Sequence, residues 1–227
     1  MLDLQDKAKE AAGKEAVQLI QEGMIVGIGT GTTAAYFIKH LIKRCQAGLS
    51  IQAIPTSERS LELLAGHIPI ADINKIPYLD MTVDGADEID WEKRMIKGGG
   101  GALLREKLVA SFSREVVIII DSSKRVDSLG NFPLPVEIVT FAYVSILRRL
   151  EGMGYAAVLR RDKSGEIFLT DGGHYIADIH FEKPPHNLAE DQEKIRAVVG
   201  VVETGFFAHL AGRVITGYPD GKVEIQK

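Results

Sequence analysis

The chain has 227 residues, 45% of them hydrophobic and 26% charged, with a formal net charge of −4. This composition indicates a folded globular protein, and the lack of a basic stripe argues against nucleic acid or an anionic membrane as the main partner. The single cysteine, Cys45, excludes an intrachain disulfide and a cysteine metal cluster, and we expect an inert thiol on a helix. The six histidines show no metal-binding spacing, and we expect His174, His180 and His186 on the surface or in loops.

The N-terminal segment MLDLQDKAKEAAGKEAVQLI is charged and has helical periodicity, which distinguishes it from a signal peptide. No stretch approaches the roughly 18 apolar residues that a membrane span needs. We therefore expect a soluble cytoplasmic protein without a membrane span.

Helices and strands alternate over residues 1–125. Apolar runs predict strands at 24–28, 51–55, 78–84 and 115–121. Amphipathic segments predict helices at 5–22, 32–45, 57–66 and 102–113, with Thr32 or Thr33 able to cap the second. Because the strands are almost continuously apolar, the fold class is predicted to be α/β, with a Rossmann-like doubly wound parallel sheet covered on both faces.

The pattern changes at 131–138, where two prolines accompany a new strand. Further segments predict strands at 155–160, 167–172 and 174–181, and helices at 140–154 and 187–198. This order indicates a second, smaller α+β (ferredoxin-like) domain. Residues 212–225 suggest two strands around a Pro-Asp-Gly turn that return to the first sheet. We predict an α/β catalytic domain of residues 1–130 plus 205–227, and a small domain of residues 131–204.

Polar segments follow the predicted strands of the first domain. They are GTGTT (29–33), PTSERS (55–60), DGADE (84–88), KGGGGALLREK (97–107) and DSSK (121–124). In an open parallel sheet, ligands bind beyond the carboxyl ends of the strands. We therefore expect these segments to converge on one rim and to carry the chemistry.

The segment GIGTGTT places three glycines directly before a predicted helix. Glycine lets backbone amides approach an anion, and a helix N-terminus favours negative charge. A dinucleotide fingerprint would have glycine in place of Thr32 and an acidic residue at the end of the next strand, and both are missing. The segment alone leaves a phosphate site and a tight turn with a capped helix equally open.

Two further segments carry candidate catalytic groups. Asp84 and Asp87 could hold sugar hydroxyls and move protons, although the spacing alone favours an Asx turn. Four consecutive glycines separate Lys97 from Glu106, and they could expose several amides on one side of the backbone. The alternative for Glu106 is a solvated helix face, because Arg105 and Lys107 flank it.

These segments together resemble type A ribose-5-phosphate isomerase. The matching stretches are GIGTGTTA, TSERS, VDGADEID, MIKGGGGALLREKL and DSSKRVDSLGNFPLPVEI, in the same order along nearly the whole chain. The resemblance implies interconversion of D-ribose 5-phosphate and D-ribulose 5-phosphate in the pentose phosphate pathway, with no metal and no cofactor. It also implies a small sugar phosphate as substrate and a homodimer or homotetramer.

The resemblance also implies roles for single residues. Glu106 would move a proton between C1 and C2, while Asp84, Asp87 and Lys97 would surround the reacting oxygens and help to open the furanose ring. The residues implied in substrate binding are Thr30, Gly31, Thr32, Thr33, Gly85, Ala86, Gly98, Gly99, Gly100 and Lys124. Lys9, or else Lys7, would reach the phosphate. The first loop reads Thr-Gly-Thr-Thr where the family often has Thr-Gly-Ser-Thr, which keeps the hydroxyl.

Other functions stay open at this stage. A sugar-phosphate sensor would need the phosphate loop but neither a base nor Lys97. A coenzyme A transferase would need a nucleophilic glutamate in another context, and a different sugar isomerase on the same sheet is also conceivable. A dinucleotide-dependent dehydrogenase is weakened by the incomplete glycine fingerprint.

Overall fold

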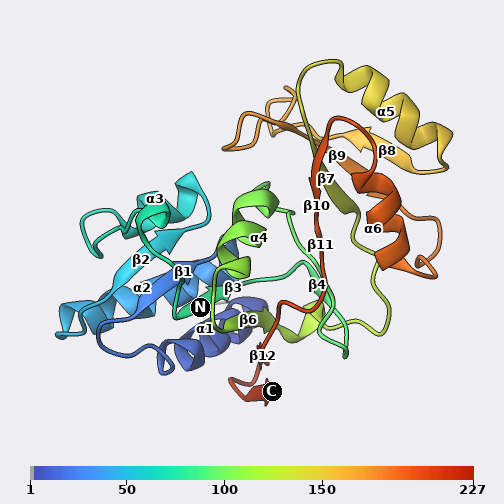
Figure 1. Cartoon of the computed structure of the whole chain (residues 1–227). Coiled ribbons are helices and arrows are strands. Elements are labelled where there is room, and N and C mark those ends of the chain that lie inside the picture. Colours follow the sequence, from blue (N-terminus) through green and yellow to red (C-terminus); the bar gives the residue numbers. More distant parts are fainter. Residues whose placement is uncertain (1–2) are drawn as a thin grey trace. The chain divides into compact units, whose positions relative to one another are not determined.

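The computed structural model describes residues 3–227, which form two compact units (Figure 1). The first unit comprises residues 3–86, Arg105–Arg125 and His209–Lys227, and the second comprises Asp87–Leu104 and Val126–Ala208. The division differs from the predicted domain boundaries chiefly because residues 87–104 belong to the second unit. Each unit has its own hydrophobic core.

The first unit is built on a six-stranded, mostly parallel sheet with the strand order β13-β12-β6-β3-β1-β2. The strands are β1 (Ile25–Ile28), β2 (Gln52–Pro55), β3 (Met81–Asp84), β6 (Val116–Asp121), β12 (Arg213–Gly217) and β13 (Val223–Gln226). Only β13 runs antiparallel to its neighbour. The predicted return of residues 212–225 to the first sheet is therefore confirmed, with β12 paired to β6.

Helices accompany this sheet on both faces. They are α1 (Leu4–Val17), α2 (Thr32–Gln46), α3 (Glu58–Leu64) and α4 (Leu103–Ser111), with short 3₁₀ turns η1 (Ile73–Lys75) and η2 (Ser122–Lys124). Successive strand residues point to opposite faces. Val26 and Ile28 of β1 share a core with Phe37 of α2, whereas Ile25 packs in a separate cluster with Val109 of α4.

The second unit contains two antiparallel sheets and two helices. Its four-stranded sheet has the order β10-β7-β9-β8, and its three-stranded sheet has the order β11-β5-β4. The strands are β4 (Glu88–Ile89), β5 (Met95–Ile96), β7 (Leu134–Ile138), β8 (Ala156–Leu159), β9 (Tyr175–His180), β10 (Val201–Thr204) and β11 (Phe206–Phe207). The helices are α5 (Tyr143–Gly152) and α6 (Leu188–Arg196), and their apolar faces join the core of this unit through Ile146 and Ile195.

Several local predictions were wrong. The first helix ends at Val17 rather than at residue 22, because the chain turns through residues 18–20 with three-residue hydrogen bonds. The segment 167–172 forms only isolated bridges at Ile167 and Leu169 instead of a strand. Neither threonine caps α2: its N-cap is Gly31, and no side chain bonds to the cap. Among the described residues, no helix is both long enough and apolar enough to cross a bilayer.

Candidate functional site

Polar groups from three neighbouring strand ends of the first unit are joined by hydrogen bonds. The hydroxyl of Thr30, which follows β1, lies 2.8 Å from the hydroxyl of Thr56 and 2.6 Å from that of Ser57, both beyond β2. The backbone N–H of Thr30 donates to Oδ1 of Asp84 at the end of β3, at 3.1 Å. Since β1 lies between β2 and β3, the parallel register brings these polar groups to one edge of the sheet.

Asp84 is almost fully buried at this edge, with only 2% of its surface exposed. Its Oδ1 accepts hydrogen bonds from the N–H of Thr30 and from the N–H of Gly85, the latter at 2.7 Å. A buried carboxylate must be compensated by donors, and these two amides supply part of that compensation. The bond to Gly85 is local, but it reaches the next residue rather than the N–H two residues on that an Asx turn uses. The bond to Thr30 joins Asp84 to a different strand end.

The N-terminus of α2 presents backbone amides without a side-chain cap. Gly31 is the N-cap and has φ of 112° and ψ of 179°, a conformation that favours glycine. The first N–H groups of any helix lack partners within the helix, and together with the helix dipole they attract anions. This arrangement favours the phosphate interpretation of GTGTT over a turn that only caps the helix.

Glu106 lies in the first turn of α4 and is only 4% exposed. Its neighbour Arg105 bonds instead to Glu58, with Nη1 2.8 Å from Oε1. The interpretation of Glu106 as part of a solvated helix face is therefore wrong. The helix turns this carboxylate inward, although charged residues flank it in the sequence.

The end of β6 is shaped by Asp121, which caps the 3₁₀ turn that carries Lys124. Its Oδ1 accepts from the N–H of Ser123 at 3.1 Å and also from the Ser123 hydroxyl. Asp121 is buried, while Lys124 is partly exposed. The carboxylate thus holds the short turn in which the predicted lysine stands.

In the second unit, Lys97 directly follows β5 and is only 4% exposed. Its N–H donates to the carbonyl of Gly205 at 2.8 Å, and its ammonium lies 5.5 Å from the ring centre of Phe207. A cation over an aromatic face is stabilised by the ring quadrupole. The lysine side chain is therefore enclosed rather than solvated.

Three of the four glycines after Lys97, Gly98, Gly99 and Gly101, are required by conformation or by close contacts. Gly98 and Gly101 have φ of 103° and 83°, and the N–H of Gly101 bonds back to the carbonyl of Gly98 at 2.9 Å, which closes a tight turn. At Gly99, a Cβ would lie 2.6 Å from Oδ1 of Asp87, and at Gly101 it would lie 2.5 Å from Cε1 of Phe168. The N–H of Gly99 donates to Oδ2 of Asp87 at 2.7 Å.

Comparison with known proteins decides the family. A family model described as ribose 5-phosphate isomerase A (phosphoriboisomerase A) matches residues 52–221. The ribose-5-phosphate isomerase A of Protochlamydia amoebophila is 51% identical over 221 residues, which cover 96% of this chain and 95% of that protein. The chain belongs to the ribose 5-phosphate isomerase A family. It is therefore an isomerase of the pentose phosphate pathway, and the resemblance predicted from its sequence segments is confirmed.

Solved structures of ribose 5-phosphate isomerases have the same fold. The enzyme from Plasmodium falciparum superposes with a TM-score of 0.93 at 36% identity, covering 98% of each chain. A D-ribose-5-phosphate isomerase solved in complex with phospho-erythronic acid superposes with a TM-score of 0.92 at 34% identity, covering 100% of both chains. The coarse prediction of an α/β protein with a mostly parallel main sheet and a smaller part is thereby confirmed.

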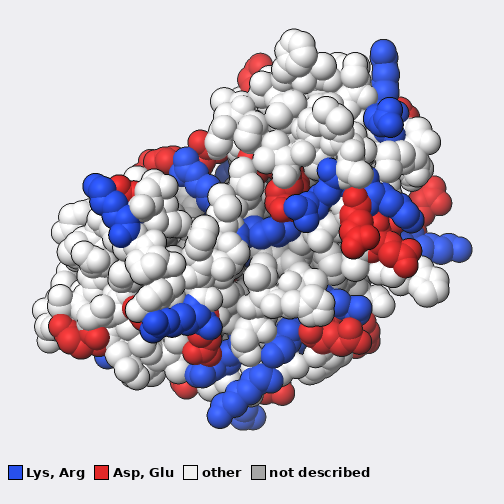
Figure 2. Space-filling model, in the orientation of Figure 1, with Lys and Arg blue, Asp and Glu red and all other residues white. Residues whose placement is uncertain are grey.

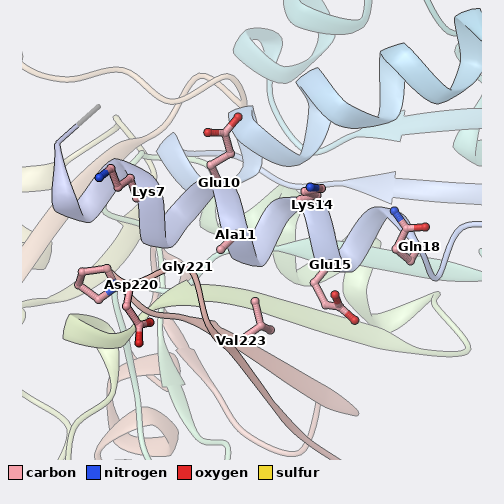
Figure 3. Close-up of a pocket in the computed structure, with 10 residues that line it drawn as sticks. Lys7, Glu10, Ala11, Lys14, Glu15, Gln18, Asp220, Gly221 and Val223 are labelled. Atoms are coloured by element: carbon pink, nitrogen blue, oxygen red, sulfur yellow. The ribbon is translucent and has the colours of Figure 1, made fainter. Parts of the chain in front are cut away.

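Of the two candidate N-terminal lysines, only Lys7 lines a groove in the first unit of this isomerase. It has a volume of about 880 Å³ and lies between α1 and the β12–β13 turn, where Lys7, Glu10, Glu15 and Asp220 are among its lining residues (Figure 3). Lys9 is not among them. Two residues apart on a helix correspond to about 200° of rotation, so Lys9 projects from nearly the opposite side of α1. Apart from Lys7, none of the predicted site residues lines this groove.

Cys45 and the three histidines singled out in the sequence lie where they were predicted. Cys45 lies on α2 as expected, and burial raises the pKa of its thiol, which disfavours the reactive thiolate. His174 lies in a loop, with Nδ1 3.0 Å from Oε1 of buried Glu137. His180 and His186 are exposed. No group of three or more potential metal ligands is found within residues 3–227.

Proposed function

We propose that this isomerase interconverts D-ribose 5-phosphate and D-ribulose 5-phosphate through an enediolate, with Glu106 as the base. The Glu106 carboxylate takes the proton from C2 of the open-chain aldose, the C–H electron pair forms the C1–C2 double bond, and the carbonyl pair of C1 moves onto O1. O1 gains a proton and O2 loses one; the electron pair of O2 then forms the carbonyl at C2, and the double-bond pair takes the proton back from Glu106 at C1. A positioned carboxylate contributes about 10²- to 10⁴-fold to such a transfer.

The observation that carries this proposal is the burial of Glu106 in the first turn of α4. Ionisable groups withdrawn from water are costly to a protein and are concentrated at functional sites. Its neighbours Arg105 and Lys107 are partly exposed, so the helix could have satisfied its charged residues at the surface. Of these three charged residues, only Glu106 is buried. A base that takes a proton from carbon has to be held in such a position, out of bulk water and facing the substrate.

Stabilisation of the enediolate is assigned to Lys97 and to the backbone amide of Gly100, with Gly98 and Gly99 as further substrate-binding residues of the same turn. Negative charge develops on the substrate oxygens as the proton leaves carbon, and one well-placed donor contributes about 3–4 kcal/mol in comparable sites. The enclosed ammonium of Lys97 supports this role. Asp84 and Asp87 are assigned to the sugar hydroxyls and to opening of the furanose ring, with Gly85 and Ala86 beside them.

Phosphate binding is assigned to the first loop and to two lysines. The uncapped N-terminus of α2 supports roles for residues 30–33, whose amides and threonine hydroxyls suit an anion. Lys124 on its capped turn and Lys9 on α1 would supply the positive charge. The position of Lys7 in the α1 groove favours Lys9 over Lys7. A relative solved with phospho-erythronic acid supports a sugar phosphate as the ligand class.

The finer structural predictions also belong to this proposal. A Rossmann-like doubly wound first domain is supported by the sheet order and by helices on both faces. A ferredoxin-like second domain is supported by the chain order β7-α5-β8-β9-α6-β10 and the strand order β10-β7-β9-β8. The domain boundaries at 130 and 205, a homodimer or homotetramer, and a cytoplasmic location stay predictions.

Nucleic acid is not proposed as a partner. On the face drawn in Figure 2, Lys and Arg are interspersed with Asp and Glu rather than gathered into a basic stripe. On this face, the mixture of charges gives no electrostatic footprint for a polyanion, and the net charge of the chain is −4.

Isotope exchange tests the proposed mechanism. When ribose 5-phosphate is incubated with the protein in D₂O, proton NMR should show deuterium entering at C1 of the product and at C2 of the remaining substrate. An enediolate that exchanges with solvent through Glu106 predicts this labelling. Isomerisation with no deuterium in either sugar would contradict exchange through a base and would favour direct hydride transfer between the carbons.

A further inference from the structure

Arg160 contacts the glycine turn from the side opposite to Asp87. It follows β8, and its Nη1 donates to the carbonyl oxygens of Gly98 and Gly99 at 2.8 and 3.3 Å. Its own N–H bonds to the carbonyl of Ile176 in β9 at 2.8 Å, so its backbone is fixed to the four-stranded sheet. The sequence pattern around Arg160 gave no indication of this contact.

Asp178 of β9 holds the guanidinium in one plane. Its two carboxylate oxygens accept from Nε and Nη2 of Arg160 at 2.8 and 2.5 Å, a bidentate ion pair whose side chains are only 13% and 15% exposed. Such forked pairs fix orientation as well as position. The ring of Phe168 lies 5.9 Å from the guanidinium, and the same ring occupies the space beside Gly101.

By binding the carbonyls of Gly98 and Gly99, Arg160 also fixes the direction of the N–H groups of Gly99 and Gly100. In a planar trans peptide, the N–H points opposite to the preceding carbonyl. With the carbonyls of Gly98 and Gly99 directed at Arg160, the N–H groups of Gly99 and Gly100 are directed away from it. The N–H of Gly99 meets the carboxylate of Asp87 on that side, at 2.7 Å.

We propose that Arg160, oriented by Asp178, is a positioning residue for the isomerase reaction. It fixes the peptides of the glycine turn so that the N–H of Gly99 holds Asp87 and the N–H of Gly100 faces the oxygen that becomes negative in the enediolate. This inference rests on the proposed function, which assigns Asp87 and Gly100 to the substrate. A purely structural ion pair would link the turn to β8 and β9 without affecting the reacting oxygens.

The test uses Arg160→Lys and Asp178→Asn, with Arg161→Lys as the matched control. Lysine keeps the charge of Arg160 but cannot make the forked contact. Arg161 is an exposed neighbour whose Nη1 also donates to a backbone carbonyl, that of Gly165 at 2.7 Å. Steady-state kinetics, thermal melting, and inhibition by phospho-erythronic acid and by inorganic phosphate are measured for each protein. The carboxylate of phospho-erythronic acid imitates the paired oxygens of the enediolate, whereas inorganic phosphate reports only the phosphate contacts.

Misplaced donors should slow the reaction without preventing phosphate binding. In Arg160→Lys, kcat should fall by about 10- to 100-fold while KM changes by less than about 3-fold. Inhibition by phospho-erythronic acid should weaken by about 10-fold or more, with inhibition by inorganic phosphate within about 2-fold of the parent. Asp178→Asn should show a smaller effect in the same direction, and Arg161→Lys should match the parent.

Three outcomes would overturn the inference. The first is a folded Arg160→Lys protein with parental kcat, and the second is equal weakening of both inhibitors, which would indicate general disruption of the fold. If Arg160→Lys does not fold, Asp178→Asn is used instead, and the inhibition constant for phospho-erythronic acid is divided by that for inorganic phosphate. The third outcome is an Asp178→Asn protein in which this ratio equals that of the parent. An inactive parent would instead overturn the proposed function, so the two failures can be told apart.

Discussion

The carboxylate of Asp84 fills the space in which a side chain at Gly29 would lie. A Cβ at Gly29 would overlap this carboxylate and lie 2.6 Å from the Cα of Asp84. Gly29 does not have a positive φ, so close approach of the neighbouring strand end, not backbone conformation, requires glycine here. The loop after β1 and the carboxylate at the end of β3 are therefore packed as one unit.

Gly29→Ala should displace Asp84 and the loop that begins at Thr30. Overpacking of this kind costs about 1–3 kcal/mol of the free energy of unfolding, and the displacement should also lower kcat/KM by at least about 10-fold. Gly152→Ala is the control, because a Cβ at Gly152 in α5 meets nothing within 4 Å. Urea denaturation and kinetics check both proteins. Equal stability and activity of the two variants would contradict the close approach.

Gly101→Ala separates the cost of a clash from the cost of conformation. Gly101 and Gly165 have similar φ, 83° and 89°, but only at Gly101 would a Cβ meet neighbours, in the ring of Phe168. Gly165→Ala should lose about 1–2 kcal/mol through the left-handed conformation alone. Gly101→Ala should lose about 1–3 kcal/mol more through overpacking. Calorimetric or denaturant melts measure the difference, and indistinguishable losses would show that the turn accommodates a side chain.

Lys9→Ala should weaken substrate binding, whereas Lys7→Ala should not. Loss of a phosphate contact removes binding energy from a part of the substrate that does not react, so KM should rise by about 10-fold or more for Lys9→Ala. Lys7 lies in the α1 groove beside acidic residues and should leave KM unchanged. Steady-state kinetics with ribose 5-phosphate compares the two variants. A rise in KM for Lys7→Ala alone would reverse the assignment.

His40 should make the fold less stable in acid. Burial lowers the pKa of His40 below its ordinary 6.5, and the charges of Lys43 and Lys39 lower it further. Glu10, whose Oε1 lies 3.3 Å from Nε2 of His40, raises the pKa but does not outweigh burial. The unfolded chain thus binds the proton more tightly. The contribution of neutral His40 to the free energy of unfolding is complete above the pKa that His40 has in the unfolded chain. It is lost as the pH falls through the lower pKa that His40 has in the folded protein.

His40→Gln tests this linkage. Between about pH 7.5 and about pH 5, the free energy of unfolding of the parent should fall more steeply than that of the variant, since glutamine does not titrate. Urea denaturation at several pH values supplies the curves. Parallel curves for the two proteins would show that His40 titrates alike in the folded and unfolded states.

The alternation of strands and helices in the first unit was predictable because buried parallel strands are continuous apolar runs. The run at 115–121 became β6 within one residue. The strands β4 and β5 were not predictable, because two residues have no period. Glu88 of β4 is buried only because the amides of Gly130 and Phe132 bond to its carboxylate at 2.8 and 2.7 Å, from 42 and 44 residues along the chain.

The segments that form the candidate site were predictable from the sequence, but the residues that hold those segments in place were not. Position after a strand identified Asp84 and the glycine turn, since the edge of a parallel sheet gathers its loops. The cap of α2 was predicted wrongly because threonine often caps a helix, whereas the N-cap is Gly31, which has no side chain to bond the first amides. Arg160 and Phe207 were not found, because each reaches the site segment from a distant strand and carries no local pattern.

The most direct test of the account compares Glu106→Gln with the parent, both treated with EDTA, in conversion of ribose 5-phosphate to ribulose 5-phosphate. Glutamine keeps the size of the buried side chain and removes the base. For Glu106→Gln, the account predicts that kcat falls by about 10²- to 10⁴-fold while phospho-erythronic acid still binds within about 3-fold of the parent affinity. The control, Glu62→Gln on the exposed side of α3, should match the parent. Near-parental turnover by a folded Glu106→Gln protein would contradict the account, because Glu106 would then not be the base.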